Sequence, residues 1–219
     1  MTGPTDRFER QRDLVPAEAL AGAVVSVIGV GAIGRHVALQ LASVGVRRLQ
    51  LIDFDRVDPT NLTTQGYRES DLGELKVVAT AKAVREIDRS ISVDVVADRC
   101  RPGSLGGDVA FCCVDSIAAR KAIWRASGPS LRFWSDGRMQ GETVRTLAVA
   151  GEIGRNRYPS TLFDPGDAHP GRCTARATIY AASIAAGLMV HQFSRFLRGL
   201  PVDPDVTLNL LASEITIEN

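Results

Sequence analysis

The sequence contains little lysine and no marked excess of either charge. Of its 26 basic residues only Lys76, Lys82 and Lys121 are lysines, which we interpret as a bias in composition. The basic residues are balanced by 25 acidic ones, which leaves a net charge of +1. A dedicated nucleic-acid or membrane surface is normally strongly basic, so neither kind of partner is expected.

Cysteine is scarce and no C-x-x-C pair is present; the four cysteines are Cys100, Cys112, Cys113 and Cys173. Neither a structural zinc site nor a disulfide framework is therefore expected, and a reducing compartment, the cytoplasm, fits this usage. The N-terminus lacks the apolar segment of a signal peptide. The longest apolar stretch, 177–190, is too short and too rich in alanine and glycine to span a membrane.

What the sequence does contain is a glycine-rich turn between an apolar run and a helical segment. The β-branched run 24–28 leads directly into Gly29-x-Gly31-x-x-Gly34. In such a turn the glycines let backbone N–H groups approach a phosphate, and the start of the helix adds positive potential. A second apolar run, 49–52, ends at Asp53, about 20 residues after the loop, where dinucleotide-binding folds hold a ribose hydroxyl. Alone, this pattern fits a purely structural turn as well as a nucleotide site.

Strand and helix patterns alternate through the first two thirds of the chain. This alternation predicts an α/β fold, a Rossmann-like and mostly parallel sheet with helices on both faces, extended by antiparallel C-terminal strands. Strands are expected at 24–28, 49–52, 91–96, 109–114, 131–134 and 142–150, with one or two more in 206–217. Helices are expected at 6–14, 17–21, 33–44, 76–87, 116–126 and 174–197.

The length of 219 residues predicts one domain. We divide it into an N-terminal helical arm (1–21), a nucleotide-binding core (22–150), a mobile loop (151–172) and a C-terminal helix and strand (173–219). Segment 57–72 is also expected to be an irregular loop. The small residues of 181–187 would pack closely against either the sheet or a second subunit.

Ligands of such sheets bind beyond the carboxyl ends of the strands. Gly29, Asp53 and Asp115 all follow predicted strands, so three separate pieces of sequence are expected to converge on one crevice.

The order and spacing of the polar residues resemble those of the ubiquitin-activating-enzyme-like adenylating family, the ThiF/MoeB/HesA group. The matching residues are Arg7-Phe8-x-Arg10-Gln11, Asp53-x-Asp55, Asn61-Leu62, Gln65, Gly73-x-x-Lys76, Val114-Asp115 with Arg120, and Ser135-Asp136-Gly137-Arg138-Met139-x-Gly141, a small-residue strand that follows the fifth strand. The resemblance covers nearly the whole chain.

The resemblance implies attack of a C-terminal glycine carboxylate, carried by a ubiquitin-like or sulfur-carrier protein, on the α-phosphate of MgATP. It also implies a homodimer. The implied roles are the nucleotide cradle for Gly29, Gly31 and Gly34, ribose for Asp53, the nucleotide site for Asp55, phosphate for Asn61 and Lys76, Mg²⁺ for Asp115, and for Arg10 a reach into the neighbouring subunit's site. Taken singly, Asp53 could cap a turn, Asp115 could cap a helix and Lys76 could be a solvated first-turn residue.

Two departures from the family pattern stand out. Thr64 occupies the position where the family usually has arginine, so one phosphate contact is missing, or is supplied by Arg68, Arg120 or another nearby cation. The family's zinc-binding cysteine pairs are absent, so the fold is expected to form without zinc.

Cys173 has two interpretations of about equal weight. A thiol at a helix N-terminus has a lowered pKa and is a good nucleophile, so Cys173 could carry a thioester after adenylation. Free cysteine is also commonly a small buried residue, the interpretation that we prefer for Cys112 and Cys113. Three other functions stay open: adenylation of a peptide or a tRNA base, a non-catalytic partner of a ubiquitin-like protein, and a dehydrogenase. The last is disfavoured because Lys76 would have no role in it.

Overall fold

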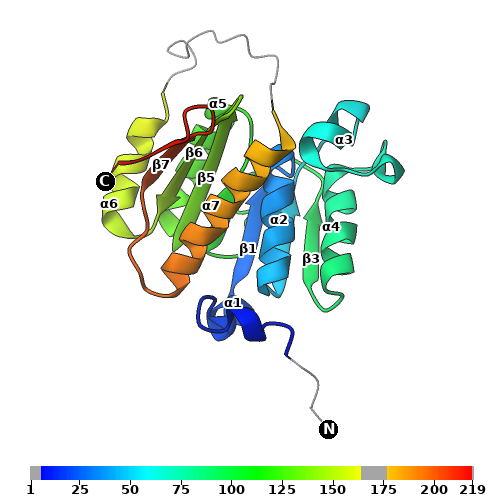
Figure 1. The fold of residues 1–219 in the computed structure, drawn as a ribbon, viewed down its shortest axis with the longest axis horizontal. Helices are drawn as coiled ribbons and strands as arrows, with labels where there is room; N and C mark the ends of the chain where they lie inside the picture. The colour runs from blue at the N-terminus through cyan, green and yellow to red at the C-terminus, as the bar shows by residue number, and fades with distance from the viewer. Residues whose placement is uncertain (1–5, 164–176, 219) are drawn as a thin grey trace.

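The structure, a computed structural model, describes residues 6–163 and 177–218, and a single eight-stranded sheet forms its centre (Figure 1). The strands are β1 (Val24–Ile28), β2 (Arg48–Ile52), β3 (Ser92–Val96), β4 (Val109–Cys112), β5 (Phe133–Gln140), β6 (Thr143–Val149), β7 (Asp205–Asn209) and β8 (Glu214–Glu218). Their order across the sheet is β3-β2-β1-β4-β5-β6-β7-β8. The five strands from β3 to β5 are parallel, and β6, β7 and β8 each run antiparallel to the strand before. The predicted fold class is confirmed.

Helices cover both faces of the sheet (Figure 1). They are α1 (Ala17–Gly22), α2 (Ala32–Val44), α3 (Pro59–Gln65), α4 (Lys76–Ile87), α5 (Ile117–Ser127), α6 (Gly151–Arg157) and α7 (Ile179–Leu197), with short 3-10 helices η1 (Glu9–Gln11), η2 (Glu69–Asp71), η3 (Gly128–Ser130) and η4 (Tyr158–Thr161). The core on one face is built with α2, α4 and α7, and the core on the other with α5 and η4. Because both faces are covered, a central strand such as β4 is buried throughout.

The proline and glycine residues of segment 57–72 suggested an irregular loop, but the segment contains the helix α3. Pro59 stands at the first turn of α3, where a missing N–H costs nothing, and Asp58 and Asn61 form a capping box. Gly66 ends the helix with a left-handed φ of 74°. These residues therefore mark the two ends of a short helix, in whose first turn the buried Asn61 accepts a hydrogen bond from the Asp58 N–H at 3.0 Å.

The prediction of a loop at 151–172 is also wrong for residues 151–161, which form α6 and η4. The cause is tertiary packing, since the Tyr158 ring packs at a tilt against Trp124, with a ring-centroid distance of 4.6 Å, and edge-to-face against Trp134 at 5.8 Å. These three rings join η4 to α5 and β5. Their packing stabilises a helical segment whose own sequence favours helix only weakly. Residues 164–172 lie outside the described residues.

The small residues of α7 pack within the chain. Ala181, Ala182, Ala185 and Ala186 are fully buried in the core beneath α7. The amide of Gln40 in α2 donates to the carbonyl of Ser183 at 3.2 Å. This close approach of two helices over the sheet accounts for the small side chains, so they give no support to a dimer.

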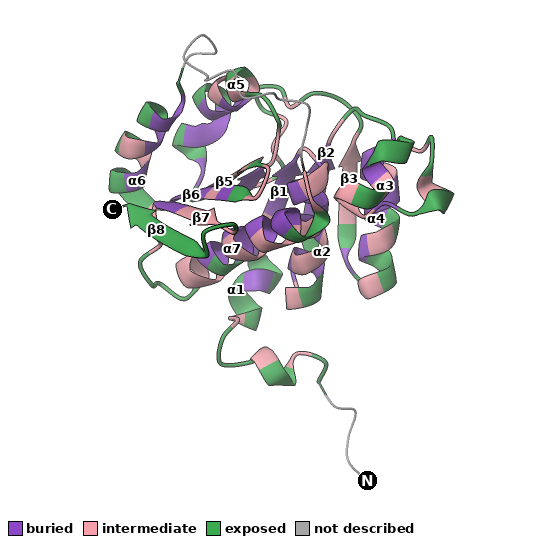
Figure 2. Cartoon of the chain, turned by 45° about the horizontal axis from the view of Figure 1, so that its top comes forward, coloured by how far each residue is buried: buried purple, intermediate pink, exposed green. Residues whose placement is uncertain are grey.

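Other boundaries differ by a few residues. The helix expected at 6–14 is only the single turn η1, and β4 ends at Cys112 rather than 114. β5 extends to Gln140 and so includes the small-residue motif expected in a following strand. The final segment is a hairpin whose last strand, β8, is the exposed edge of the sheet (Figure 2). No helix in the described ranges is long and apolar enough to cross a membrane.

Candidate active site

The glycine loop lies at the carboxyl edge of the parallel strands, between β1 and α2. Gly29 has a φ of 81°, and its N–H donates to the Ile52 carbonyl at 2.8 Å. A Cβ at Gly34 would lie 1.8 Å from the Gly29 carbonyl oxygen, and one at Gly29 would lie 3.0 Å from backbone atoms of Cys113. These two glycines are therefore required by the close packing of the loop on itself and on the end of β4.

Gly31 is different, because a Cβ there would meet only the Gln65 Oε1 atom, at 3.8 Å. Its φ of −73° is negative, and its ψ of −144° lies outside the helical and extended regions. The protein leaves room above Gly31 at the start of α2, a helix of 13 residues whose first N–H groups carry positive partial charge. This cradle fits a phosphate group.

The acids after β2 close one side of the cradle. The Asp53 Oδ2 atom accepts a hydrogen bond from the Val30 N–H at 2.8 Å, and its Oδ1 atom accepts one from the Asp55 N–H at 2.8 Å. Asp53 therefore links the glycine loop to the end of β2, which is the turn-forming role considered for it. Carboxylate oxygens have further lone pairs, so the same geometry can also accept from ribose hydroxyls.

Lys76 is not a solvated first-turn residue, since only 7% of its surface is exposed. Its ammonium group lies 3.2 Å from Asp55 Oδ2, and it stands at the N-terminus of α4, where a cation opposes the helix dipole. A buried lysine in an unfavourable position needs an anionic partner. Asp55 is the partner among the described residues, and a phosphate group is a second anion that this position would suit.

Both cations considered for the place of the missing arginine have other partners in the structure. The hydroxyl of Thr64 donates to the Thr60 carbonyl within its own helix at 2.8 Å. Arg68 forms an exposed ion pair with Glu86 at 2.7 Å. Arg120 is buried and donates to Val114, Asp136 and Gly137.

Asp115 follows β4, the strand next to β1, at the same carboxyl edge of the sheet. Ser116, and not Asp115, caps α5, and in the described part of the chain the Asp115 side chain is exposed and makes no hydrogen bond or ion pair. No group of three His, Cys, Asp or Glu side chains among the described residues could hold a metal by itself. A single carboxylate such as Asp115 can still hold a cation whose remaining ligands are substrate phosphates and water.

Arg10 lies far from the crevice of its own chain. The N-terminal arm is fixed at the other end of α2, where Gln11 donates to the Val44 carbonyl at 2.7 Å and Arg7 pairs with Asp88 at 3.1 Å. The 13 residues of α2 separate the two ends by about 20 Å. Arg10 is exposed there and cannot serve its own glycine loop.

Two residues near the loop escaped the sequence analysis. The Tyr67 hydroxyl donates to the Val30 carbonyl at 2.6 Å, and the Arg35 guanidinium stacks on its ring at 4.3 Å. Burial raises the pKa of Tyr67, so the phenol keeps its proton and remains a donor. The aromatic residue in the polar segment 63–74 was the available signal. This pair therefore holds the glycine loop in place through the carbonyl of Val30.

Cys173 lies outside the described residues, whereas Cys112 and Cys113 are placed at the end of β4. Burial raises the pKa of Cys112 to about 12 and that of Cys113 well above its ordinary value. The thiolate is the reactive form of cysteine. Neither residue can therefore act as a nucleophile near neutral pH.

In native protein at pH 8, we expect iodoacetamide to leave Cys112 and Cys113 unmodified, because with a pKa of about 12 only about one Cys112 thiol in ten thousand is ionised. Mass spectrometry of tryptic peptides measures this, and protein unfolded in urea is the control in which both should be modified fully. Alkylation of either residue in the folded protein at the unfolded rate would contradict this placement.

A strand order of 3-2-1-4-5 with a glycine loop after the first strand defines a Rossmann-like nucleotide-binding α/β protein. The model of the ThiF family matches residues 9–215. The chain therefore belongs to the ThiF family, as its motifs indicated.

Three similar proteins illustrate the relationship. The chain is 31% identical over 144 residues to the NEDD8-activating enzyme E1 catalytic subunit of Caenorhabditis elegans, covering 63% of this chain and 33% of that protein. It is 40% identical over 77 residues to the adenylyltransferase and sulfurtransferase MOCS3 of Dictyostelium discoideum, covering 35% and 18%. The crystal structure of PaaA aligns with a TM-score of 0.76 at 23% identity, covering 97% of this chain and 82% of that one. The chain thus spans a third or less of the length of these two curated relatives.

Proposed function

We propose that this chain is an adenylyltransferase, a single ThiF-type domain that activates the C-terminal glycine carboxylate of a ubiquitin-like or sulfur-carrier protein with MgATP. The observation that carries the proposal is the buried Lys76, held by Asp55 at the glycine loop. A dehydrogenase has no use for a cation there, whereas a site that handles a triphosphate does. The names of the NEDD8-activating and adenylyltransferase relatives support the same chemistry.

In the proposed reaction a carboxylate oxygen bonds to the α-phosphorus of ATP, and the bond from that phosphorus to the bridging oxygen of pyrophosphate breaks. Both reactants are anionic, so catalysis requires positive groups fixed in advance around the phosphates. We assign this role to Lys76, the Asn61 amide and the N–H groups at the start of α2. Asp53 binds the ribose. Asp115 would hold Mg²⁺, which neutralises charge on the phosphates and leaving group.

We further propose a homodimer. Arg10 lies at the end of its own subunit remote from the crevice, and it is exposed. It would complete a partner's site as an additional cation, which would offset the loss of the arginine at Thr64. The proposed cellular location is the cytoplasm. If a thioester forms after adenylation, Cys173 is the proposed acceptor.

A non-catalytic role as a partner of a ubiquitin-like protein is the second candidate. It is favoured by one observation, the Thr64 hydroxyl that bonds within its own helix and supplies no cation. If the protein is an enzyme, a peptide or a tRNA base remains an alternative acceptor. The net charge of +1 argues against binding of tRNA.

The decisive experiment is ATP–pyrophosphate exchange. Purified protein, MgATP and labelled pyrophosphate are incubated with each ubiquitin-like or sulfur-carrier protein of the source organism that ends in glycine. We expect exchange with one carrier, and none with the same carrier lacking its terminal glycine, because the carboxylate would no longer reach the α-phosphate. Nucleotide binding without exchange for any carrier would favour the non-catalytic role.

A further inference from the structure

A carboxylate is buried in the middle of the sheet, close to the crevice but outside the residues assigned above. Asp136 lies in β5, opposite Cys112 on β4 and Leu147 on β6, and it is 0% exposed. An isolated charge in such a place is strongly unfavourable, and even a well-paired one is often less stable than an apolar replacement. Asp136 therefore requires an explanation other than stability of the fold.

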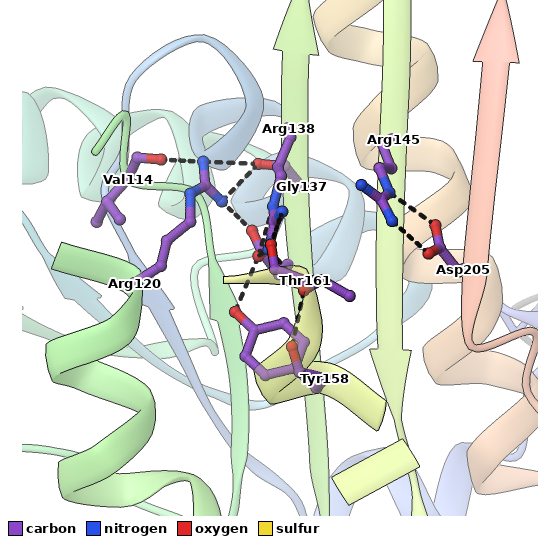
Figure 3. Close-up of polar contacts among 9 residues, drawn as sticks. Val114, Arg120, Gly137, Arg138, Arg145, Tyr158, Thr161 and Asp205 are labelled. Carbon is purple, nitrogen blue, oxygen red and sulfur yellow. Dashed lines mark hydrogen bonds and ion pairs between the residues drawn. The ribbon is translucent and has the colours of Figure 1, made fainter. Parts of the chain in front are cut away.

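Arg120, Arg138 and Tyr158, which are labelled in Figure 3, donate hydrogen bonds to this carboxylate. Arg120 donates to its Oδ1 atom. Arg138 donates to Oδ2 from Nε at 2.9 Å and from Nη2 at 2.8 Å, and the Tyr158 hydroxyl donates to Oδ2 at 2.9 Å. Burial and the neighbouring acid raise the pKa of Tyr158, so it stays a donor. Asp136 is thus fixed by groups from α5, β5 and η4.

Arg120 uses the other side of its guanidinium group to hold the chain at the crevice. Its Nη2 atom donates to the Val114 carbonyl, and both Nη atoms lie within 3.2 Å of the Gly137 carbonyl. Val114 directly precedes Asp115. At this point the ladder of β4 has ended at Cys112 and α5 begins after Ser116, so the bond from Arg120 restrains a peptide that belongs to neither element.

We propose that Arg120, held in place by Asp136, is a positioning residue for Asp115: it fixes the Val114–Asp115 peptide so that the carboxylate faces the phosphates of Mg-bound nucleotide. This inference rests on the proposed function. The planar guanidinium of arginine can bind two acceptors on different elements at once, which the single ammonium of lysine does far less well. Arg138 and Tyr158 act one step further away, because they hold Asp136 but do not contact Val114.

The test compares Arg120→Lys, which keeps the positive charge, with Tyr158→Phe, which removes one donor to Asp136 and leaves Arg120 intact. Two quantities are measured: the ¹⁵N order parameter of the Asp115 amide in ligand-free protein, which reports how rigidly the Val114–Asp115 peptide is held, and the dissociation constants of MgATP and of AMP without Mg²⁺. For Arg120→Lys we expect the order parameter of the Asp115 amide to fall from a rigid-backbone value of about 0.85 to below about 0.6, and MgATP affinity to fall at least tenfold. AMP affinity should change less than twofold, since AMP without the metal does not need Asp115.

Tyr158→Phe should lower the melting temperature and leave both quantities near the wild-type values. The inference is overturned if Arg120→Lys weakens MgATP and AMP equally, or if Tyr158→Phe changes the MgATP-to-AMP ratio as much as Arg120→Lys does. Wild-type protein that binds neither nucleotide would overturn the proposed function and this inference with it. Wild-type binding with an unchanged ratio in Arg120→Lys overturns the inference alone.

If Arg120→Lys does not fold, the wild-type protein supplies the same test. The side-chain ¹⁵N resonances of Arg120 should shift on addition of MgATP and stay in place on addition of AMP. The positioning role would be contradicted if the Arg120 resonances shifted equally with MgATP and with AMP. It would also be contradicted if they did not shift when either nucleotide was bound.

Discussion

Gly34→Ala is expected to destabilise the protein by about 3 kcal/mol or more, one of the largest effects of any single methyl group in this chain. The added Cβ would lie 1.8 Å from the Gly29 carbonyl oxygen and 3.1 Å from the Cys113 Cβ atom. These are a backbone atom and a packed core atom, so neither can move without shifting β1 or β4. Urea unfolding followed by circular dichroism measures the loss.

Two other glycines are matched controls for this substitution. Gly22→Ala places a Cβ with no atom within 4 Å, so the free energy of unfolding should change by less than about 1 kcal/mol. Gly31→Ala brings its Cβ no closer than 3.8 Å to another atom, so it should lose much less stability than Gly34→Ala. Its methyl group lies in the cradle and should weaken ATP binding at least ~10-fold, roughly the loss of one phosphate contact. Equal stability of Gly34→Ala and Gly22→Ala would show that the loop is not packed as described.

Asp115→Asn is expected to lower the rate of adenylate formation by at least ~100-fold, or about 2.7 kcal/mol of transition-state stabilisation. The amide keeps the shape of the side chain but is a poor ligand for Mg²⁺, so positive charge at the leaving pyrophosphate is lost. Stability should be unchanged, because in the described part of the chain the exposed carboxylate makes no bond that the fold uses. Single-turnover formation of the acyl-adenylate, followed by mass spectrometry, is the measurement.

Glu152→Gln is the matched control, an exposed acid in the first turn of α6. It removes the same charge from the protein without touching the crevice, and it should retain the wild-type rate. A full rate in Asp115→Asn, or an equal loss in Glu152→Gln, would remove Asp115 from the reaction.

The parallel part of the sheet was predictable because the local and tertiary signals agree there. β1 and β4 are short apolar runs, and both are buried in the sheet. α2 ends at Gly45 as expected, with a φ of 107°. In such segments periodicity, end signals and burial all favour the same structure.

The segments that were predicted wrongly are those in which composition and packing disagree. Pro59 and Gly66 suggested a loop, and they are the first turn and the C-cap of α3. Residues 151–161 have little helical periodicity, and the contacts of Tyr158 with two tryptophans decide their structure. Contacts between segments remote in sequence cannot be read from either segment alone.

The candidate site was predictable in part. The glycine loop, Asp53, Asp55 and Lys76 are joined by hydrogen bonds and an ion pair at one edge of the sheet. Spacing alone could not reveal the support from Tyr67, nor the double contact of Arg120 with Asp136 and Val114. The signal for the latter was an acid two residues after the apolar pair Phe133-Trp134. Arg10 and Cys173 stay predictions, the first because it would act in a partner and the second because it lies outside the described residues.

Calorimetric titration with nucleotide tests the central claim most directly. The account predicts that wild-type protein binds ATP, that Mg²⁺ strengthens this binding, and that Asp115→Asn loses the effect of Mg²⁺ while still binding ATP. It also predicts no comparable affinity for NAD. Binding of NAD in preference to ATP, or ATP binding that is indifferent to both Mg²⁺ and Asp115, would contradict an adenylation site in this crevice.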